Sequence, residues 1–197
     1  MKPLRMALFF GAIALASAAA DAQQNVQLRG TITAIDGDML SLKSRDGKDL
    51  TIHLPDKLNV SVTKAAAITD VKPGDYVAST AMKRADGTLV ALEVHFLPPT
   101  APQGHTPYDL QPGSTMTNAN VAAIVQSAGG RELSLEYKGG SQRILVPDGA
   151  PVVRAVPGSR ADLKPGEYVF AVARVAADGN MTAVRIQVSK DGVKPPQ

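Results

Sequence analysis

Histidine is the side chain in this sequence best suited to binding a transition metal, and the chain has three: His53, His95 and His105. His53 and His95 fall on the polar sides of two segments whose alternation of apolar and polar residues predicts β-strands. If those strands lie near each other, the pair could bind a metal ion, with Glu93 or Asp49 as a further ligand. The spacing of a helical two-histidine motif, H-x-x-x-H, is absent. The alternative is that both histidines are ordinary solvent-facing residues of a sheet.

A second group of side chains suited to directed contacts lies in residues 98–119, a stretch with five prolines. Proline favours extended and turn conformations, so we expect this stretch to link two domains without forming a helix. A plain spacer would be rich in Gly and Ser, whereas this linker carries His105, Tyr108, Asp109 and Met116. These four are candidate ligand-binding residues. The alternative is a structural strap that packs its apolar side chains against the domains.

No pattern in the sequence indicates catalysis. A G-x-S-x-G elbow, a phosphate-binding loop and H-E-x-x-H are all absent. Ser114 has no histidine near it in sequence except His105. Residues 36–38 (Asp-Gly-Asp) resemble half a calcium-binding loop, but a hairpin turn is enough to explain them. We therefore predict a protein without catalytic residues and without a cofactor.

The amino-acid composition limits the classes of binding partner that we expect. The chain has no cysteine, which excludes disulfides and thiolate ligands. The net charge is only +3, the basic residues are scattered, and six aromatic residues follow residue 22, so nucleic acid is not an expected partner. A protein, an envelope component or a small ligand fits better.

The sequence repeats itself at an interval of 92 residues. The octapeptide DVKPGDYV at residues 70–77 returns as DLKPGEYV at residues 162–169, and further matches follow at the same offset in the same order. This indicates a duplicated domain. In each copy Lys-Pro-Gly predicts a tight turn, with Val71 or Leu163 closing one end of a barrel.

Each copy contains five short segments with the alternation and turn residues of β-strands. In the first strand, Gly30 predicts a bulge or a sharp bend. The pattern predicts an all-β fold of two tandem OB-like five-stranded barrels joined by an extended Pro-rich segment. We place domain 1 at residues 23–97, the linker at 98–119, domain 2 at 120–190 and a disordered tail at 191–197.

The last strand of each copy predicts one core face and one wet face. The expected core residues are Val90, Leu92, Val94 and Phe96 in copy one and Val184, Ile186 and Val188 in copy two. The expected polar-face residues are Ala91, Glu93 and His95 in copy one and Ala183, Arg185 and Gln187 in copy two.

The pattern GTITAID…LSL…DG…DVKPGDYV…DGTLVALEV resembles exported bacterial OB-like domains of unknown function. GHTPYDLQPGSTMTNANV at residues 104–121 is similar to the middle segment of small tandem-domain proteins from Gram-negative bacteria. Such chains often carry the label "metal ABC transporter permease", which does not suit a sequence without a membrane-spanning segment after residue 22. The resemblance implies a fold and a compartment, and it implies no activity or catalytic residue.

Residues 1–22 have the layout of a secretory signal peptide, with Lys2 and Arg5 before an apolar stretch and an A-x-A box at residues 20–22. An uncleaved anchor is the alternative. We therefore predict export to the periplasm, with no integral membrane segment after cleavage. The function we expect is that of a non-enzymatic binding or scaffolding protein of the bacterial envelope, and the alternative is a periplasmic metal-binding protein that uses surface histidines.

Overall fold

The computed structural model describes residues 24–196, so the predicted signal peptide lies outside the described residues. Within them the chain is all-β, with two single-turn 3-10 segments, η1 (Ile68–Asp70) and η2 (Arg160–Asp162). Nowhere in residues 24–196 is there a helix with the length and apolarity needed to cross a membrane. The strands are β1 (Gln24–Asp36), β2 (Met39–Ser44), β3 (Asp49–His53), β4 (Asn59–Ala66), β5 (Tyr76–Lys83), β6 (Leu89–Phe96), β7 (Gly104–Pro107), β8 (Ser114–Ser127), β9 (Gly130–Tyr137), β10 (Gly140–Pro147), β11 (Val152–Pro157), β12 (Tyr168–Val175) and β13 (Met181–Val188).

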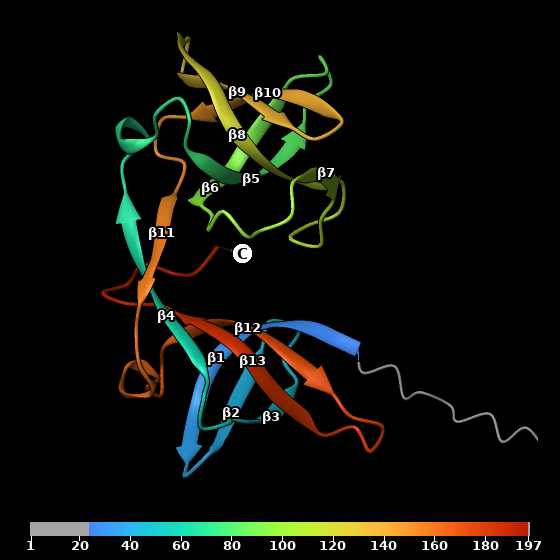
Figure 1. Ribbon diagram of the computed structural model, residues 1–197, viewed down its shortest axis with the longest axis vertical. Helices are drawn as coiled ribbons and strands as arrows, with labels where there is room; N and C mark the ends of the chain where they lie inside the picture. The colour runs from blue at the N-terminus through green and yellow to red at the C-terminus, as the bar shows by residue number, and fades with distance from the viewer. Residues whose placement is uncertain (1–23, 197) are drawn as a thin grey trace, which may run out of the picture.

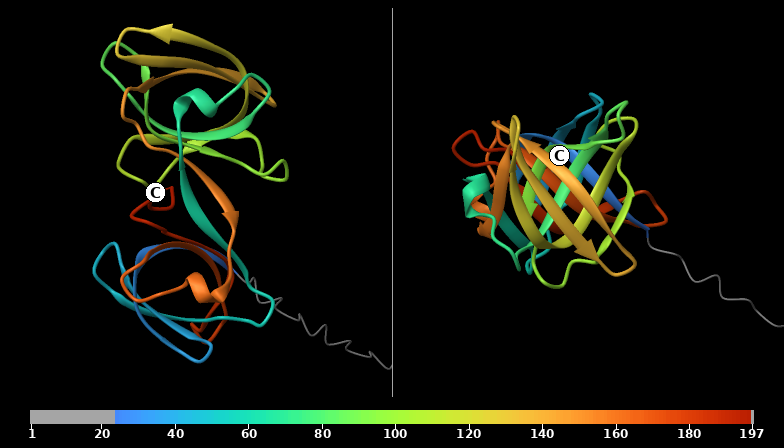
Figure 2. Two further views of the ribbon diagram at one scale, coloured as in Figure 1. Left: turned by 90° about the vertical axis from the view of Figure 1, so that its left-hand side faces the viewer. Right: turned by 90° about the horizontal axis from the view of Figure 1, so that it is seen from above.

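Hydrogen bonding joins ten of these strands into two closed rings (Figure 1). Ring 1 runs β13-β12-β1-β2-β3 and is closed by the pairing of β3 with β13. Ring 2 runs β10-β9-β8-β5-β6 and is closed by the pairing of β10 with β6. The rings lie one above the other, and the antiparallel pair of β4 and β11 runs between them (Figure 2).

The two rings do not correspond to the two copies of the repeat. At the offset of 92 residues, β1–β3 are equivalent to β8–β10, and β5–β6 are equivalent to β12–β13. Ring 1 therefore takes three strands from copy one and two from copy two, and ring 2 has the reverse composition. The expected division, one barrel within residues 23–97 and another within 120–190, does not describe this strand pairing. Both copies carry the same apolar pattern, so the pattern alone does not specify which copy supplies a partner strand.

The strands that connect the two rings, β4 and β11, explain why the two copies exchange strands. β4 reads NVSVTKAA and β11 reads VVRAVP, and neither has a glycine or an internal proline at which the chain could turn back. β-branched residues favour a straight extended backbone. The two segments pair with each other from Ser61 opposite Pro157 to Ala66 opposite Val152. Each strand thus carries its copy out of one ring and into the other.

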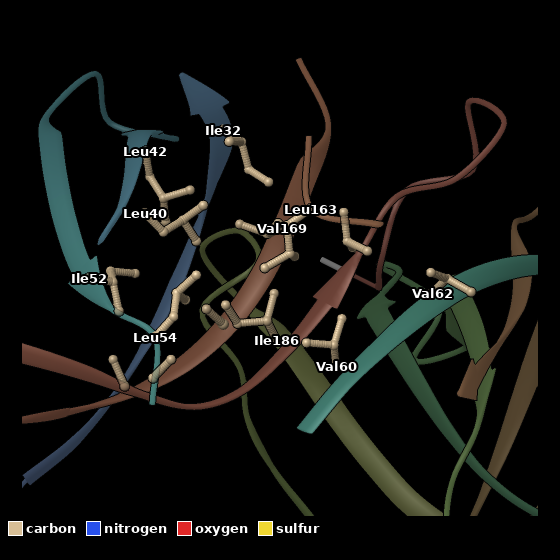
Figure 3. Packing of buried hydrophobic residues seen from close by; sticks show 14 residues of the cluster. Ile32, Leu40, Leu42, Ile52, Leu54, Val60, Val62, Leu163, Val169 and Ile186 are labelled. Atoms are coloured by element: carbon tan, nitrogen blue, oxygen red, sulfur yellow. The ribbon is translucent and has the colours of Figure 1, made fainter. Parts of the chain in front are cut away.

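Each ring encloses a hydrophobic core to which both copies contribute. Figure 3 shows the core of ring 1. Burying an aliphatic side chain stabilises a fold by about 1.5–3 kcal/mol, so either copy alone lacks much of what stabilises each core. The predicted burial of Val71 and Leu163 is confirmed. Val71 packs in the ring 2 core and Leu163 in the ring 1 core, in each case against residues of the other copy. The ring 1 core consists of Ile32, Leu40, Leu42, Ile52, Leu54, Val60 and Val62 from copy one with Leu163, Val169, Ala171, Ala173, Ala183, Ile186 and Val188 from copy two. The ring 2 core consists of Val71, Val77, Ala81, Ala91 and Val94 with Ala119, Val121, Leu133, Leu135, Ile144, Val146 and Val152.

The repeated octapeptide joins the copies twice in the same way. The Gly74 N–H donates to the carbonyl of Val121, and the Gly166 N–H donates to the carbonyl of Ile32, each over 2.8 Å. Both glycines have φ near +90° (93° and 91°), a conformation that L side chains rarely adopt. The duplicated phrase is therefore a turn that docks each copy onto the first strand of the other.

Gly30 lies where β1 passes from β12 to β2. A Cβ at this position would come within 2.4 Å of the Lys43 carbonyl oxygen, so the close approach of the two backbones requires glycine. The β1–β2 register shifts between Ile32 and Ala34. The irregularity predicted from Gly30 is therefore present, two residues further along the strand.

Candidate functional site

The region between the two rings, which we call the waist, collects polar side chains from both. Its walls are the outer faces of β5 and β6 on ring 2 and of β1, β12 and β13 on ring 1. The described C-terminal residues run into this region and end between the two rings (Figure 1 and the left view of Figure 2). Linker residues 108–116 complete it.

The last strands of the two copies bring equivalent positions to the waist. Glu93 and His95 on β6 correspond to Arg185 and Gln187 on β13, 92 residues later. Glu93 is 6% exposed and Gln187 is 8% exposed, so the faces expected to be wet are largely covered. Glu93 Oε1 accepts a hydrogen bond of 3.0 Å from the Thr80 hydroxyl.

A bulge in each of these strand pairs changes which residues point inward. The register shifts within β5–β6 and again within β12–β13, and as a result Ala91 and Ala183 enter the cores. Val90 and Leu92 are partly exposed and Val184 is 41% exposed. The prediction of these three as core residues was wrong because a bulge reverses the alternation of faces on one side of it.

Arg29 of β1 is a buried cation that ties the linker to ring 1. Its side chain is 4% exposed. Nη1 and Nη2 donate to the two carboxylate oxygens of Asp109 over 2.8 and 3.0 Å, and Nη2 also donates to the Tyr108 hydroxyl over 2.8 Å. Burial alone would lower the pKa of Arg29, but Tyr108 and Asp109 together raise it. Burial raises the pKa of Tyr108, against the opposing effect of Arg29.

A second guanidinium, that of Arg185, shares an aromatic ring with Arg29. The two guanidinium carbons lie 5.1 Å (Arg29) and 5.2 Å (Arg185) from the Phe170 ring centroid. Arg185 has no hydrogen bond or ion pair to any residue of the part of the chain described. Burial lowers its pKa, although Tyr108 acts in the opposite direction.

His95 faces the same region and is neutral at physiological pH. Burial, and secondarily the charge of Arg185, lowers the pKa of His95 to about 4. Its Nδ1 is buried without a hydrogen-bond partner among residues 24–196, and the same holds for Nε of Arg29. Buried polar atoms in proteins are nearly always hydrogen-bonded, so two such atoms at one place point to a missing partner.

The C-terminal residues form one wall of a pocket of about 420 Å³ at the waist. The opposite wall consists of Glu93, Pro151 and Val153, and the tail contributes residues 192–196. The pocket is thus lined mainly by apolar groups, with Glu93 and Lys194 as its charged residues.

The tail reaches the waist through a tight turn at Asp191-Gly192, where φ is 53° and 79°. Lys190 and Val193 on either side exchange backbone hydrogen bonds of 3.1 and 2.9 Å. Pro195 is buried, and Lys194 Nζ lies 5.3 Å from the Tyr168 ring centroid. Residues 191–196, for which we expected disorder, therefore fold back against the molecule. The Asp-Gly pair that makes this turn is a standard hairpin signal that the sequence reasoning did not use here.

Of the four linker candidates, three lie at the waist. Tyr108 and Asp109 bind Arg29, and Met116 Sδ accepts a hydrogen bond of 3.8 Å from the Thr80 hydroxyl. His105 lies apart from them on β7, where Nδ1 is 2.8 Å from Thr117 Oγ1 and the ring stacks on Tyr137 with centroids 6.4 Å apart.

The two histidines proposed as a metal pair belong to different rings. His53 lies on β3 of ring 1, with Nε2 3.2 Å from Asp38 Oδ2, whereas His95 lies on β6 of ring 2. Asp49 pairs with Lys43 over 3.1 Å. Among the residues the structure describes, no group of three or more His, Asp or Glu side chains is placed to hold a metal ion.

Three residues of the waist were not singled out by the sequence reasoning: Arg29, Phe170 and Arg185. Arg29 is the only charged residue in the alternating stretch NVQLRGTITAI (residues 25–35), and this was an available signal. Phe170 and Arg185 gave no signal, because each looks like an ordinary residue on the outer face of a strand. Phe170 and Arg185 lie on paired strands of copy two, and their meeting with Arg29 of copy one depends on the exchange of strands.

The chain is therefore an all-β protein in which two strand-exchanged rings enclose a charged waist. A domain of unknown function, DUF5666, is found at residues 29–95. This stretch runs from β1 to β6, which is copy one of the repeat. No curated protein and no solved structure matches the chain. The resemblance to domains of unknown function is thus confirmed for copy one.

Proposed function

We propose that the protein is an exported, non-enzymatic binding or scaffolding protein of the bacterial envelope, and that the waist is its contact site. We further propose that each ring is an OB-like barrel completed by strands of the other copy. The five short strands of each ring, the glycine bend at Gly30 in β1 and the 3-10 turn before β5 and before β12 support this assignment.

The observation that carries the proposal is the set of polar groups without partners at the waist. The buried Nδ1 of His95 and Nε of Arg29 have no hydrogen-bond partner within residues 24–196, and the exposed guanidinium of Arg185 beside them has no described acceptor. An unsatisfied buried polar group costs about 1–3 kcal/mol. Two such atoms, one on β1 and one on β6, near the exposed Arg185 and a pocket lined by Glu93, are best explained by a partner that satisfies them.

Export is supported by residues 1–22, which have the charge and apolar pattern of a signal peptide. Cell fractionation of a Gram-negative host that expresses the full chain tests this part. Detection should use an antibody, because a C-terminal tag would extend the tail that lies at the waist. We expect the protein in the periplasmic fraction, shortened by about the length of the leader.

Photo-crosslinking in the periplasm tests the contact site. A photoreactive phenylalanine analogue replaces Lys194, an exposed residue that lines the pocket. The control places it at Val125, which is 54% exposed on β8 of ring 2. We expect a defined adduct at residue 194 and none at residue 125. The same adducts at both positions, or none at residue 194, would contradict the proposal.

A further inference from the structure

We propose that the waist binds an oxyanion, a carboxylate or phosphate group, with Arg185 as its main contact. This inference rests on the proposed function and names the chemistry of the partner. Two guanidinium groups, those of Arg29 and Arg185, lie against the aromatic ring of Phe170.

The charges beside the Phe170 aromatic ring are not balanced. The charge of Arg29 is compensated by the two carboxylate oxygens of Asp109. Arg185 has no such partner among the described residues, and it forms no ion pair with Glu93, the residue at the equivalent position in copy one. The guanidinium is a planar fork of N–H donors that matches carboxylate and phosphate oxygens. An anion is therefore the group that would complete this arrangement.

Hydrogen-bond donors are in excess near Arg185. The Tyr108 hydroxyl accepts from Arg29 and has no described acceptor for its own proton. Nε of Arg29 is a buried donor without an acceptor. The Tyr108 ring centroid lies 5.4 Å from the guanidinium carbon of Arg29, which shares the Phe170 ring with Arg185. A cationic ligand would meet these donors and the two guanidinium groups, so the local chemistry disfavours it.

The waist also has space for the rest of the ligand. The pocket of about 420 Å³ beside Glu93 is walled by Pro151, Val153 and the tail residues. Lys194 lines it and adds a second cation that has no ion pair within residues 24–196. Because Glu93 also lines the pocket, the ligand that fits is one whose anionic head contacts Arg185 and whose small apolar body occupies the pocket.

The experiment is a calorimetric titration of the purified protein at pH 7 and low salt, with inorganic phosphate in one arm and hexanoate in the other. We expect saturable binding in at least one arm, weakened by added NaCl because the contact is electrostatic. Phosphate alone would assign a phosphate ligand, and hexanoate alone would assign a carboxylate. The absence of binding in both arms would overturn the inference.

The variant Arg185→Gln tests the named contact, and Arg174→Gln on the neighbouring strand β12 is the matched control. Arg174 is exposed four residues beyond Phe170, and its side chain has no hydrogen bond, ion pair or ring contact among the described residues. We expect Arg185→Gln to weaken binding by about tenfold or more and Arg174→Gln to leave it unchanged. Thermal unfolding of each variant verifies that it folds. Equal affinity of Arg185→Gln and the parent protein would overturn the inference. If the crosslink at residue 194 forms while neither anion binds, only this inference fails and the proposed function stands.

Discussion

The two copies of the repeat are alike where they build the rings and different where they meet. Val71 and Leu163 are both buried, and Gly74 and Gly166 both dock on the other copy over the same distance. At the waist the equivalents diverge: Glu93 and His95 in copy one are Arg185 and Gln187 in copy two. A symmetric pair of like charges facing each other would repel. The exchange of strands therefore gives each ring an equivalent core and gives the waist two different walls.

Separating the copies should have the largest effect. Residues 23–103 and 104–197, expressed as two chains, each lack strands of both cores, so neither should fold as a closed monomer. We expect each fragment to be unfolded or a strand-exchanged homodimer, and an equimolar mixture to form a one-to-one complex. Circular dichroism and analytical ultracentrifugation provide the measurement. Two monomeric fragments that unfold cooperatively on their own would show that each copy closes on itself.

Shortening the two equivalent core residues compares the rings. Leu163→Ala should reduce the free energy of unfolding by about 3 kcal/mol, because it leaves a cavity in the ring 1 core. Val71→Ala in ring 2 removes less volume and should cost about 2 kcal/mol. Urea denaturation measures both, with Val125→Ala as an exposed control expected within 0.5 kcal/mol of the parent (about the usual surface range). A loss from Leu163→Ala no larger than the control would contradict the assigned core.

His95, whose equivalent in copy two is Gln187, should make the free energy of unfolding depend on pH. Because folding lowers the pKa of His95 from its ordinary 6.5 to about 4, the unfolded chain binds more protons between these values. The free energy of unfolding should rise with pH across this window, by at most about 3 kcal/mol. His95→Gln, which installs the residue found at position 187, should remove this part of the pH profile.

A proton NMR titration of the same histidine isolates the effect of its neighbour. Arg185→Gln removes the charge that helps lower the pKa of His95, so the pKa should move upward while burial still keeps it below 6.5. An unchanged pKa would separate the two residues and weaken the description of the waist as one cluster.

Removing the partner of the buried cation should have the smallest effect. Asp109→Asn leaves Arg29 without a counter-ion and should cost about 1–2 kcal/mol, because Asp109 itself is exposed and water replaces part of the contact. The control is Glu132→Gln, which breaks the pair with the exposed Arg143 and should cost about 0.5 kcal/mol or less. Denaturant unfolding compares them, and an equal cost would show that burial of Arg29 adds nothing.

The local structure could be predicted from the sequence, and the long-range pairing could not. Strand positions follow from alternation and turns from Lys-Pro-Gly and Asp-Gly, and the burial of Val71 and Leu163 followed from the same pattern. Bulges reversed the faces around Leu92 and Val184, because one inserted residue is invisible in an alternating pattern.

The candidate site was predictable only on its linker side. Tyr108 and Asp109 were conspicuous within a Pro-rich stretch, and the structure brings both to Arg29. Arg29 and Arg185 come from different copies, and nothing in either local sequence indicates the other. The exchange that unites them depends on the pairing of β4 with β11, two segments far apart in the sequence.

The exchange of strands is the central claim, and the absence of cysteine allows a direct test with an engineered disulfide. Asn25 of β1 lies opposite Arg174 of β12 in the exchanged pairing, whereas a copy that closed on itself would place it opposite Met82 of β5, the equivalent of Arg174. We predict that Asn25→Cys with Arg174→Cys forms a disulfide within the monomeric chain under mild oxidation, and that Asn25→Cys with Met82→Cys does not. A disulfide in the second variant and none in the first would contradict the exchanged fold.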